Sequence, residues 1–331
     1  AVVEKNDWAS GTSSASSKLI HGGLRYLKEW DFGLVKHSLA ERRTLSTIAP
    51  HLVTPLKLIA PVYKHSENGR MAIKAGLTLY DMLAGKGQPV PKHQGLSKKV
   101  LTEQYPFLNP EQLKGGFSFG DCQEDDARLT LEVIEAAQQQ GAITVNHAKV
   151  TKLLTDNNAV CGAQVQDRVT GETLDVRATL TINAAGPWAA GLTSTIKPQT
   201  RGELKLVKGV HLVMPPILNA AGTQCTDAFF VTARSDGRVF FIIPWYDATL
   251  VGTTESIIND PTELRVTTAE AQYLLDESNA QLSGVAWTLA DIRGAFSGAR
   301  TLQNENKDAN STTREFKVLE PIERMLMPIG G

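Results

Sequence analysis

The sequence predicts an α/β protein in which one domain is assembled from separate segments and a second domain is inserted into it twice. The chain has 331 residues, of which 42% are hydrophobic, so it can bury a large core. Mixed strand and helix patterns occupy its beginning, its middle and its extreme end. Two β-rich stretches separate these parts, and such alternation indicates a discontinuous domain that carries an insertion.

The composition argues against several classes of function. The 34 Lys and Arg residues nearly balance the 35 Asp and Glu residues, so the chain has no positive field for nucleic acid, and we expect no nucleic-acid partner. The three cysteines include no C-x-x-C pair, which favours a reduced, cytoplasmic chain without a metal site. No apolar run approaches the roughly 18 residues of a membrane helix. A peripheral contact with the inner membrane stays open.

Apolar periodicity predicts helices, and the signal is clearest after residue 125. Asp125 or Asp126 can cap this helix and Gly141 can end it. Thr267 or Thr268 can cap a later one. The predicted helices cover 32–48, 71–83, 126–140 and 267–281.

Alternating patterns bounded by turn residues predict two groups of strands. A meander follows the helix at 126–140, with strands in 143–154, 163–165 and 174–182. An antiparallel sheet is predicted from four later runs, 210–214, 228–233, 239–243 and 248–251.

Two stretches near the start can bind a nucleotide cofactor or can be ordinary surface. Glu4 closes the short strand Val2-Val3, and such a glutamate can accept hydrogen bonds from ribose hydroxyls, although most strand-terminal glutamates are solvated. The polar run 10–17 can be a linker, or it can wrap phosphate with its hydroxyls and amides. The ordered pattern after it favours phosphate binding.

One long motif decides between these alternatives. Residues 13–27 read S-S-A-S-S-K-L-I-H-G-G-L-R-Y-L, and this run resembles the signature of FAD-dependent glycerol-3-phosphate dehydrogenases. Further matches follow in the family's order along essentially the whole chain, at 121–129, 183–188, 208–211, 243–254, 296–300, 313–315 and 330–331.

The resemblance implies an FAD-binding Rossmann-like domain, incomplete here, with an inserted antiparallel-sheet substrate domain, α+β overall. The FAD-binding domain would comprise 1–48, 125–204 and 323–331, and the substrate domain 49–124 and 205–322. By the same resemblance, FAD would contact Glu4, Thr12, Ser13, Ser14, Lys18, Leu19, His21, Val150, Ala184, Ala185, Gly186, Gly330 and Gly331.

The substrate implied by the resemblance is glycerol 3-phosphate, whose dianionic phosphate needs guanidinium groups. The family-matched arginines are Arg25, Arg300 and Arg314, and Tyr26 and His211 match positions near the glycerol end. We expect His211 to be the catalytic base, because histidine suits proton transfer near neutral pH, with Arg300 steadying the developing alkoxide. His21 is the competing histidine.

Departures from the family's pattern leave other functions open. Thr301 replaces the usual proline, and Glu255 replaces the usual aspartate after G-T-T. We expect a chain truncated at both ends, without the pyrophosphate loop, the lysine after Gly331 and the C-terminal helical domain. The alternatives are a glycerol-3-phosphate oxidase that makes hydrogen peroxide and a flavin-free binding module; an amine or amino-acid oxidase fits poorly. For the dehydrogenase, we expect a quinone or other electron acceptor and leave a homodimer open.

Overall fold

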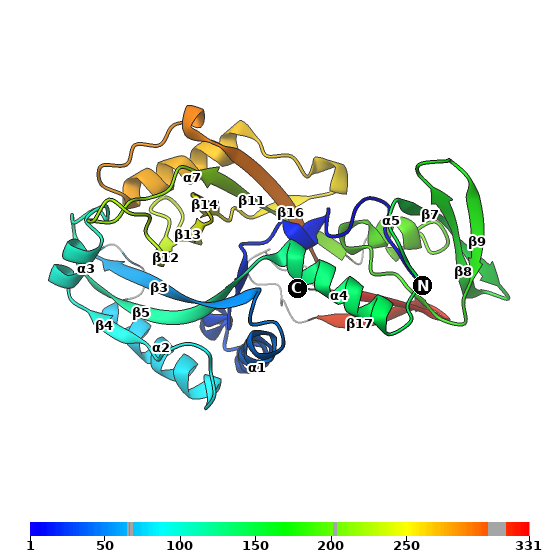
Figure 1. The fold of residues 1–331 in the computed structure, drawn as a ribbon, viewed down its shortest axis with the longest axis horizontal. Coiled ribbons are helices and arrows are strands. Elements are labelled where there is room, and N and C mark those ends of the chain that lie inside the picture. Colours follow the sequence, from blue (N-terminus) through cyan, green and yellow to red (C-terminus); the bar gives the residue numbers. More distant parts are fainter. Residues whose placement is uncertain (65, 67–68, 201–203, 304–315, 331) are drawn as a thin grey trace.

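The structure is a computed structural model that describes the chain except for residues 65, 67–68, 201–203, 304–315 and 331. Its elements form two groups along the long axis (Figure 1). One group is a large sheet with α1, α2, α3 and α7 around it, and the other holds three small sheets with α4 and α5. The strand β16 runs from the large sheet toward the second group, so it joins the two parts of the fold.

The helices begin and end close to the predicted positions. Asp125, of the two candidates, caps α4 by accepting a hydrogen bond from the amide of Arg128, and Thr267 caps α7 within a capping box with Glu270. The short helix α3 was not predicted; Ser97 caps it. The helices are α1 (Phe32–Ile48), α2 (Arg70–Ala84), α3 (Lys98–Gln104), α4 (Asp126–Gln139), α5 (Ala189–Thr193) and α7 (Thr268–Gln281).

Ten strands form the large sheet, which has the order β15-β11-β14-β13-β12-β3-β5-β2, with β16 on β11 and β4 on β5. Every pairing is antiparallel except that of β12 with β3. The strands are β2 (Leu19–Ile20), β3 (Val53–Tyr63), β4 (Gln94–Leu96), β5 (Leu113–Glu124), β11 (Leu204–Met214), β12 (Ala228–Thr232), β13 (Val239–Trp245), β14 (Ala248–Gly252), β15 (Ser256–Ile258) and β16 (Gly294–Gln303).

Three small sheets make up the second group. The parallel pairs β1-β6 and β10-β18 belong to it, as does the antiparallel meander β7-β8-β9. The predicted strand 174–182 is in fact two strands, β9 and β10, because its two ends pair with different sheets. The strands are β1 (Val2–Val3), β6 (Thr144–Val145), β7 (Ala148–Asp156), β8 (Ala159–Asp167), β9 (Thr173–Arg177), β10 (Thr181–Ile182), β17 (Lys317–Ile322) and β18 (Met325–Ile329).

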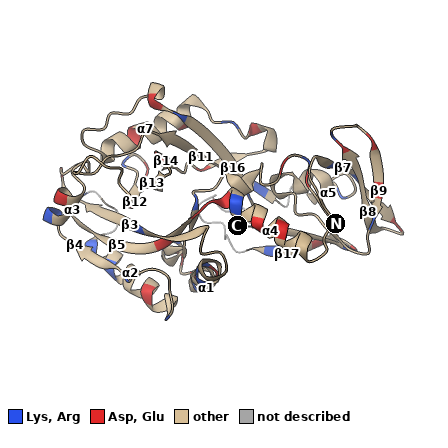
Figure 2. Cartoon of the chain, viewed as in Figure 1, with Lys and Arg blue, Asp and Glu red and all other residues tan. Residues whose placement is uncertain are grey.

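Short 3-10 helices complete the described elements, and charge is spread over both groups. In the view of Figure 2, basic and acidic residues are interspersed over the helices and strands. Within the described residues, none of the helices has the length and the hydropathy that a membrane crossing requires. The 3-10 helices are η1 (Thr12–Ser14), η2 (Leu24–Glu29), η3 (Gly186–Trp188), η4 (Pro261–Glu263) and η5 (Leu289–Asp291).

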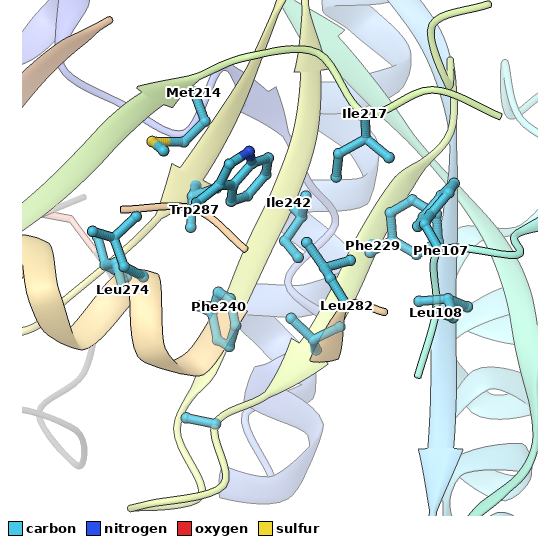
Figure 3. Close-up of a cluster of buried hydrophobic side chains, with 14 of the residues drawn as sticks. Phe107, Leu108, Met214, Ile217, Phe229, Phe240, Ile242, Leu274, Leu282 and Trp287 are labelled. Atoms are coloured by element: carbon cyan, nitrogen blue, oxygen red, sulfur yellow. The ribbon is translucent and has the colours of Figure 1, made fainter. Parts of the chain in front are cut away.

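The main hydrophobic core lies between the large sheet and α7 (Figure 3). The ring of Phe229 on β12 meets those of Tyr105 and Phe107 edge-on, each at 5.3 Å between centroids. Alternate residues of β11, namely Val210, Leu212 and Met214, are buried in the same cluster. Because successive side chains of a strand point to opposite faces, this core turns the residues between them to the other face of the sheet.

A buried network of charged and polar groups holds the backbone at Gly22, just after β2. One carboxylate oxygen of Asp121 on β5 accepts hydrogen bonds from the amide of Gly22 at 3.0 Å and the hydroxyl of Tyr80 at 2.8 Å. The same oxygen forms an ion pair with Arg42 of α1. Side-chain exposure is 1% for Arg42 and 3% for Asp121, so these bonds replace water that neither group can reach.

We predict that Arg42→Met destabilises the fold by about 3–5 kcal/mol, because it leaves the Asp121 carboxylate buried without its cation. Chemical denaturation monitored by circular dichroism measures this loss. The matched control is Glu103→Gln, which removes an exposed ion pair with Lys99 and should change stability by less than about 0.5 kcal/mol. Equal effects of the two variants would contradict the prediction.

Candidate active site

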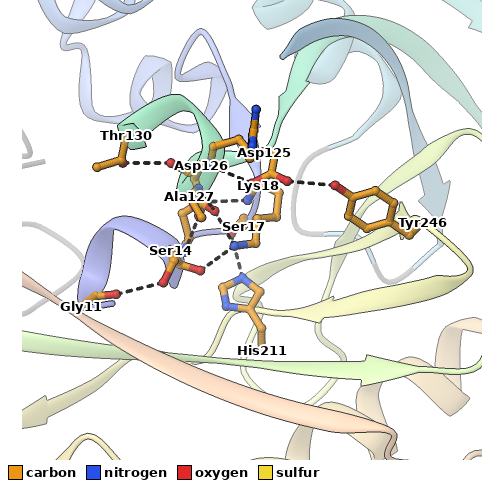
Figure 4. Close-up of polar contacts among 12 residues, drawn as sticks. Gly11, Ser14, Ser17, Lys18, Asp125, Asp126, Ala127, Thr130, His211 and Tyr246 are labelled. Atoms are coloured by element: carbon orange, nitrogen blue, oxygen red, sulfur yellow. Dashed lines mark hydrogen bonds and ion pairs between the residues drawn. The ribbon is translucent and has the colours of Figure 1, made fainter. Parts of the chain in front are cut away.

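His211 projects from β11 on the face opposite the hydrophobic core. Its Nε2 lies 2.8 Å from the hydroxyl oxygen of Ser17 (Figure 4). Its ring stacks on that of Phe296, with 5.1 Å between centroids and 13° between planes. The imidazole is buried, and its Nδ1 has no hydrogen-bond partner among the described residues. The sheet therefore holds this ring in a fixed position with one ring nitrogen uncommitted.

The surroundings of His211 keep its imidazole neutral. Burial disfavours the charged form, and Arg300 and Lys18 add positive charge nearby; together they lower the pKa of His211 to about 3. A neutral imidazole has one nitrogen able to accept a proton, and the hydroxyl of Ser17 can either donate to Nε2 or accept from it. The state required of a proton acceptor is thus built into the fold.

The position of the His211 ring explains why residue 252 is a glycine. Gly252 on β14 lies opposite His211 in the register, and a Cβ added there would come within 2.3 Å of the Cδ2 atom of the ring. Real side-chain atoms do not approach this closely, so only glycine leaves space for the imidazole. The glycine of the G-T-T motif is consequently part of the histidine site.

The polar run before β2 is anchored to the start of α4. The ammonium of Lys18 lies 2.6 Å from Asp126 and also donates to the carbonyl oxygen of Ser14 (Figure 4). The hydroxyl of Ser16 donates to the other oxygen of Asp126 at 2.7 Å. Lys18 and Asp126 are both buried, so this ion pair holds the loop in place rather than facing solvent.

The same loop packs on β16. The hydroxyl of Thr12 donates to the carbonyl oxygen of Ala299 at 3.0 Å. A Cβ at Gly298 would come within 3.0 Å of Ala15, so the loop backbone approaches the strand closely. Ser13 and Leu19 lie in the same stretch, on either side of the anchored segment, and η1 contacts both β16 and α4.

Two of the predicted substrate arginines meet at one carboxylate. Arg25 on η2 and Arg300 on β16 each place a guanidinium nitrogen 3.5 Å from the Oε1 atom of Glu255. The side chain of Glu255 is 8% exposed, whereas those of Arg25 and Arg300 are 27% and 28% exposed. The two arginine side chains are therefore partly exposed, whereas the carboxylate that joins them is buried. Arg314 lies outside the described residues.

The second histidine, His21, lies near the arginines. Its Nδ1 accepts a hydrogen bond of 3.0 Å from the amide of Gly23, and its ring is 6.2 Å from that of Tyr26. Burial lowers the pKa of His21, Arg25 and Arg300 lower it further, and Asp121 opposes them. Both candidate bases are thus neutral imidazoles, and His21 has one nitrogen already engaged by the backbone.

The remaining predicted cofactor residues surround the small sheets. The backbone oxygen of Glu4 accepts from the amide of Ala148 at the start of β7, the strand that carries Val150. The turn with Ala184 and Ala185 is fixed by the buried side chain of Asn183. Gly186 follows at a φ of +52°, with open space where a side chain would project.

Strand β16 connects these residues with the rest of the site. The 3-10 helix η3, which begins at Gly186, contacts β16 as η1 does. The amide of Gly330 donates to the carbonyl oxygen of Thr301 on the same strand at 2.8 Å. Gly331 lies outside the described residues. The loop with Thr12, the turn with Gly186 and the segment with Gly330 thus all border β16.

Sequence reasoning missed the contacts that join these residues. Ser17 was not linked to His211, Phe296 was not expected to stack on it, and Asp126 was not expected to pair with Lys18. All of them stand inside the recognised motifs, which was the available signal. Spacing along the chain does not reveal partners that lie in distant segments.

A comparison with protein families agrees with this geometry. Residues 1–315 match the model described as FAD dependent oxidoreductase, DAO. The chain belongs to this family.

Curated relatives show which members of this family the chain resembles. It is 36% identical over 334 aligned residues to proteins named aerobic glycerol-3-phosphate dehydrogenase from Staphylococcus saprophyticus and Staphylococcus aureus. These alignments cover 100% of this chain and 59% of each relative, so the chain spans well under two thirds of their length.

Solved structures show the same fold. The chain is similar to the glycerol-3-phosphate dehydrogenase from Bacillus halodurans complexed with FAD, with a TM-score of 0.72 and 29% identity over 99% of this chain and 55% of that one. Glycine oxidase from Geobacillus kaustophilus gives 0.70 at 20% identity, over 99% and 81%. At that identity the likeness concerns the fold alone.

We predict that Gly252→Ala displaces the ring of His211 and destabilises the fold by about 1–3 kcal/mol, because the new methyl group overlaps the imidazole. Denaturation gives the stability, and the imidazole resonances in NMR spectra report the ring. Gly76→Ala is the control: Gly76 lies within α2 with nothing near its missing Cβ, so alanine there should stabilise by about 0.5–1 kcal/mol. An unmoved ring in the Gly252 variant would refute the steric argument.

We also predict that His211→Gln makes stability less sensitive to acid. The folded imidazole has its pKa lowered from 6.5 to about 3, so below pH 6.5 the unfolded chain binds the proton more readily. Stability that is present above this value is lost as the pH falls toward about 3. Denaturation midpoints at pH values across this window should fall less in His211→Gln than in the wild type. The exposed His37→Gln is the control and should follow the wild type.

Proposed function

We propose that the protein to which this chain belongs oxidises glycerol 3-phosphate to dihydroxyacetone phosphate. The carbon that bears the secondary hydroxyl loses a hydride, and the hydroxyl loses its proton to a base, so that a carbonyl group forms. FAD, the cofactor of the family, accepts the hydride when bound. The names and structures of the relatives support this choice of substrate.

The observation that carries the proposal is the meeting of Arg25 and Arg300. A phosphate dianion requires fixed positive charge, and guanidinium groups pair with its oxygens in a planar fork. The two arginines come from η2 and β16, far apart in sequence, yet they share one carboxylate and are partly exposed. Tyr26 stands beside them, its ring 5.1 Å from the guanidinium carbon of Arg25.

We assign the proton acceptor to His211. Its imidazole is neutral, so one nitrogen can accept a proton, and Phe296 and Ser17 hold the ring in place. Arg300 lies on the same strand as Phe296, an even number of residues away, so both side chains point to one face, where Arg300 can steady the developing alkoxide. His21 remains the alternative base.

The residues present fit a flavin nucleotide. A nucleotide needs backbone that approaches closely and small hydroxyl groups, and the loop with Thr12, Ser13 and Ser14 supplies both. Gly186 has open space beside it, so its backbone can face a ligand. Glu4 would hold the ribose and Val150 would contact the adenine end, as the resemblance implies.

The electron acceptor and the cellular setting stay predictions from the resemblance. We propose a quinone or other electron acceptor and a cytoplasmic protein; a peripheral contact with the inner membrane and a homodimer stay open. The oxidase alternative differs only in returning electrons to oxygen, so the test below includes it.

We predict that glycerol 3-phosphate, added without oxygen, reduces and bleaches the flavin of the FAD-loaded chain. Glycerol should leave the flavin oxidised, because it lacks the phosphate that the arginines recognise. Absorbance in the flavin band measures this reduction. Peroxide formation in air at the rate of turnover would favour the oxidase. Bound flavin that glycerol 3-phosphate leaves oxidised would contradict the proposal.

A further inference from the structure

Glu255 occupies an unusual place between the two arginines. Its Oε1 atom is the shared partner of Arg25 and Arg300, and its side chain is less exposed than that of either arginine. The backbone of Glu255 is held as well, because its carbonyl oxygen accepts a hydrogen bond of 3.0 Å from Arg238. The carboxylate is therefore fixed at a defined point, while the cations reach it from two other elements.

We propose that Glu255 is a positioning residue that holds Arg25 and Arg300 together as one phosphate-binding unit. This inference rests on the proposed function and deepens it. Glu255 does not contact the substrate in this assignment. It acts by fixing the two groups that do.

Arg25 and Arg300 are both cations that approach one point. Two guanidinium groups that approach one point repel each other, and they also lose rotamer freedom when they are ordered. A buried carboxylate between them offsets both effects before any ligand arrives, because it attracts both cations to the same oxygen. The guanidinium groups stay positively charged when they pair with the carboxylate, so they still attract an anion.

Preorganisation makes this arrangement useful for binding. A ligand that meets groups already in place does not have to order them, so less of its interaction is lost. The loop that carries Glu255 follows the G-T-T motif beside Gly252, and Arg300 lies on the strand that carries Phe296. Glu255 thus also ties the phosphate unit to the elements that hold His211.

Two other roles make different predictions. A carboxylate that only neutralises charge for stability would change the melting temperature and not the affinity for phosphate. A carboxylate that competes with phosphate for the arginines would make binding tighter once it is removed. Charge and shape can be separated, because Glu255→Gln keeps the shape and removes the charge, whereas Glu255→Asp keeps the charge and shortens the side chain.

The experiment is isothermal titration of the full chain with inorganic phosphate and with glycerol 3-phosphate. We expect Glu255→Gln to raise both dissociation constants at least about tenfold, as expected when charge-assisted contacts lose their fixed geometry. Glu255→Asp should restore binding to within about threefold of the wild type. Glu111→Gln, which changes an exposed glutamate two residues before β5, is the matched control and should bind as the wild type does.

The outcomes separate the inference from the proposed function. Unchanged or tighter binding by Glu255→Gln, with a wild type that binds glycerol 3-phosphate, overturns the positioning role alone. Binding that Glu255→Asp does not rescue also overturns it, because the charge would then not be the cause. A folded, flavin-loaded wild type that binds neither ligand overturns both the proposed function and the inference.

Discussion

The pairing of β11 with β16 is the constraint on which the site depends. The ladder runs from Leu204 opposite Gln303 to Val213 opposite Gly294 without a break in register. It sets His211 against Phe296, and it carries Arg300 along the same strand toward the small sheets. A slip of one residue would turn every side chain of one strand to the opposite face and would dismantle the site.

Buried ion pairs connect the loops to this framework. Lys18 with Asp126 anchors the polar loop to α4, and Lys208 on β11 pairs with Glu270 of α7 at 2.9 Å. Burying such charges removes them from water, so their net contribution to stability is small even though breaking one is severe. Their value lies in specifying where each segment sits, which an apolar contact would leave less well defined.

The fold and the chemistry are separable. Glycine oxidase shares the architecture at 20% identity, so the scaffold alone does not select a substrate. Selection depends on the side chains placed on that scaffold. Here Arg25 and Arg300 meet Glu255, and a neutral His211 stands on the neighbouring strand, and the proposed substrate rests on this combination.

The sequence by itself determined the helices and the family, because apolar periodicity, caps such as Asp125 and a fifteen-residue motif are local signals. It missed β3 and β5, whose prolines and glycines break the alternating pattern, and it missed β16. Only the tertiary structure decided that Ser17 meets His211 and that Glu255 joins Arg25 to Arg300. The physical reason is that these contacts arise from sheet register between distant segments, and register is set by packing of the whole core rather than by neighbouring residues.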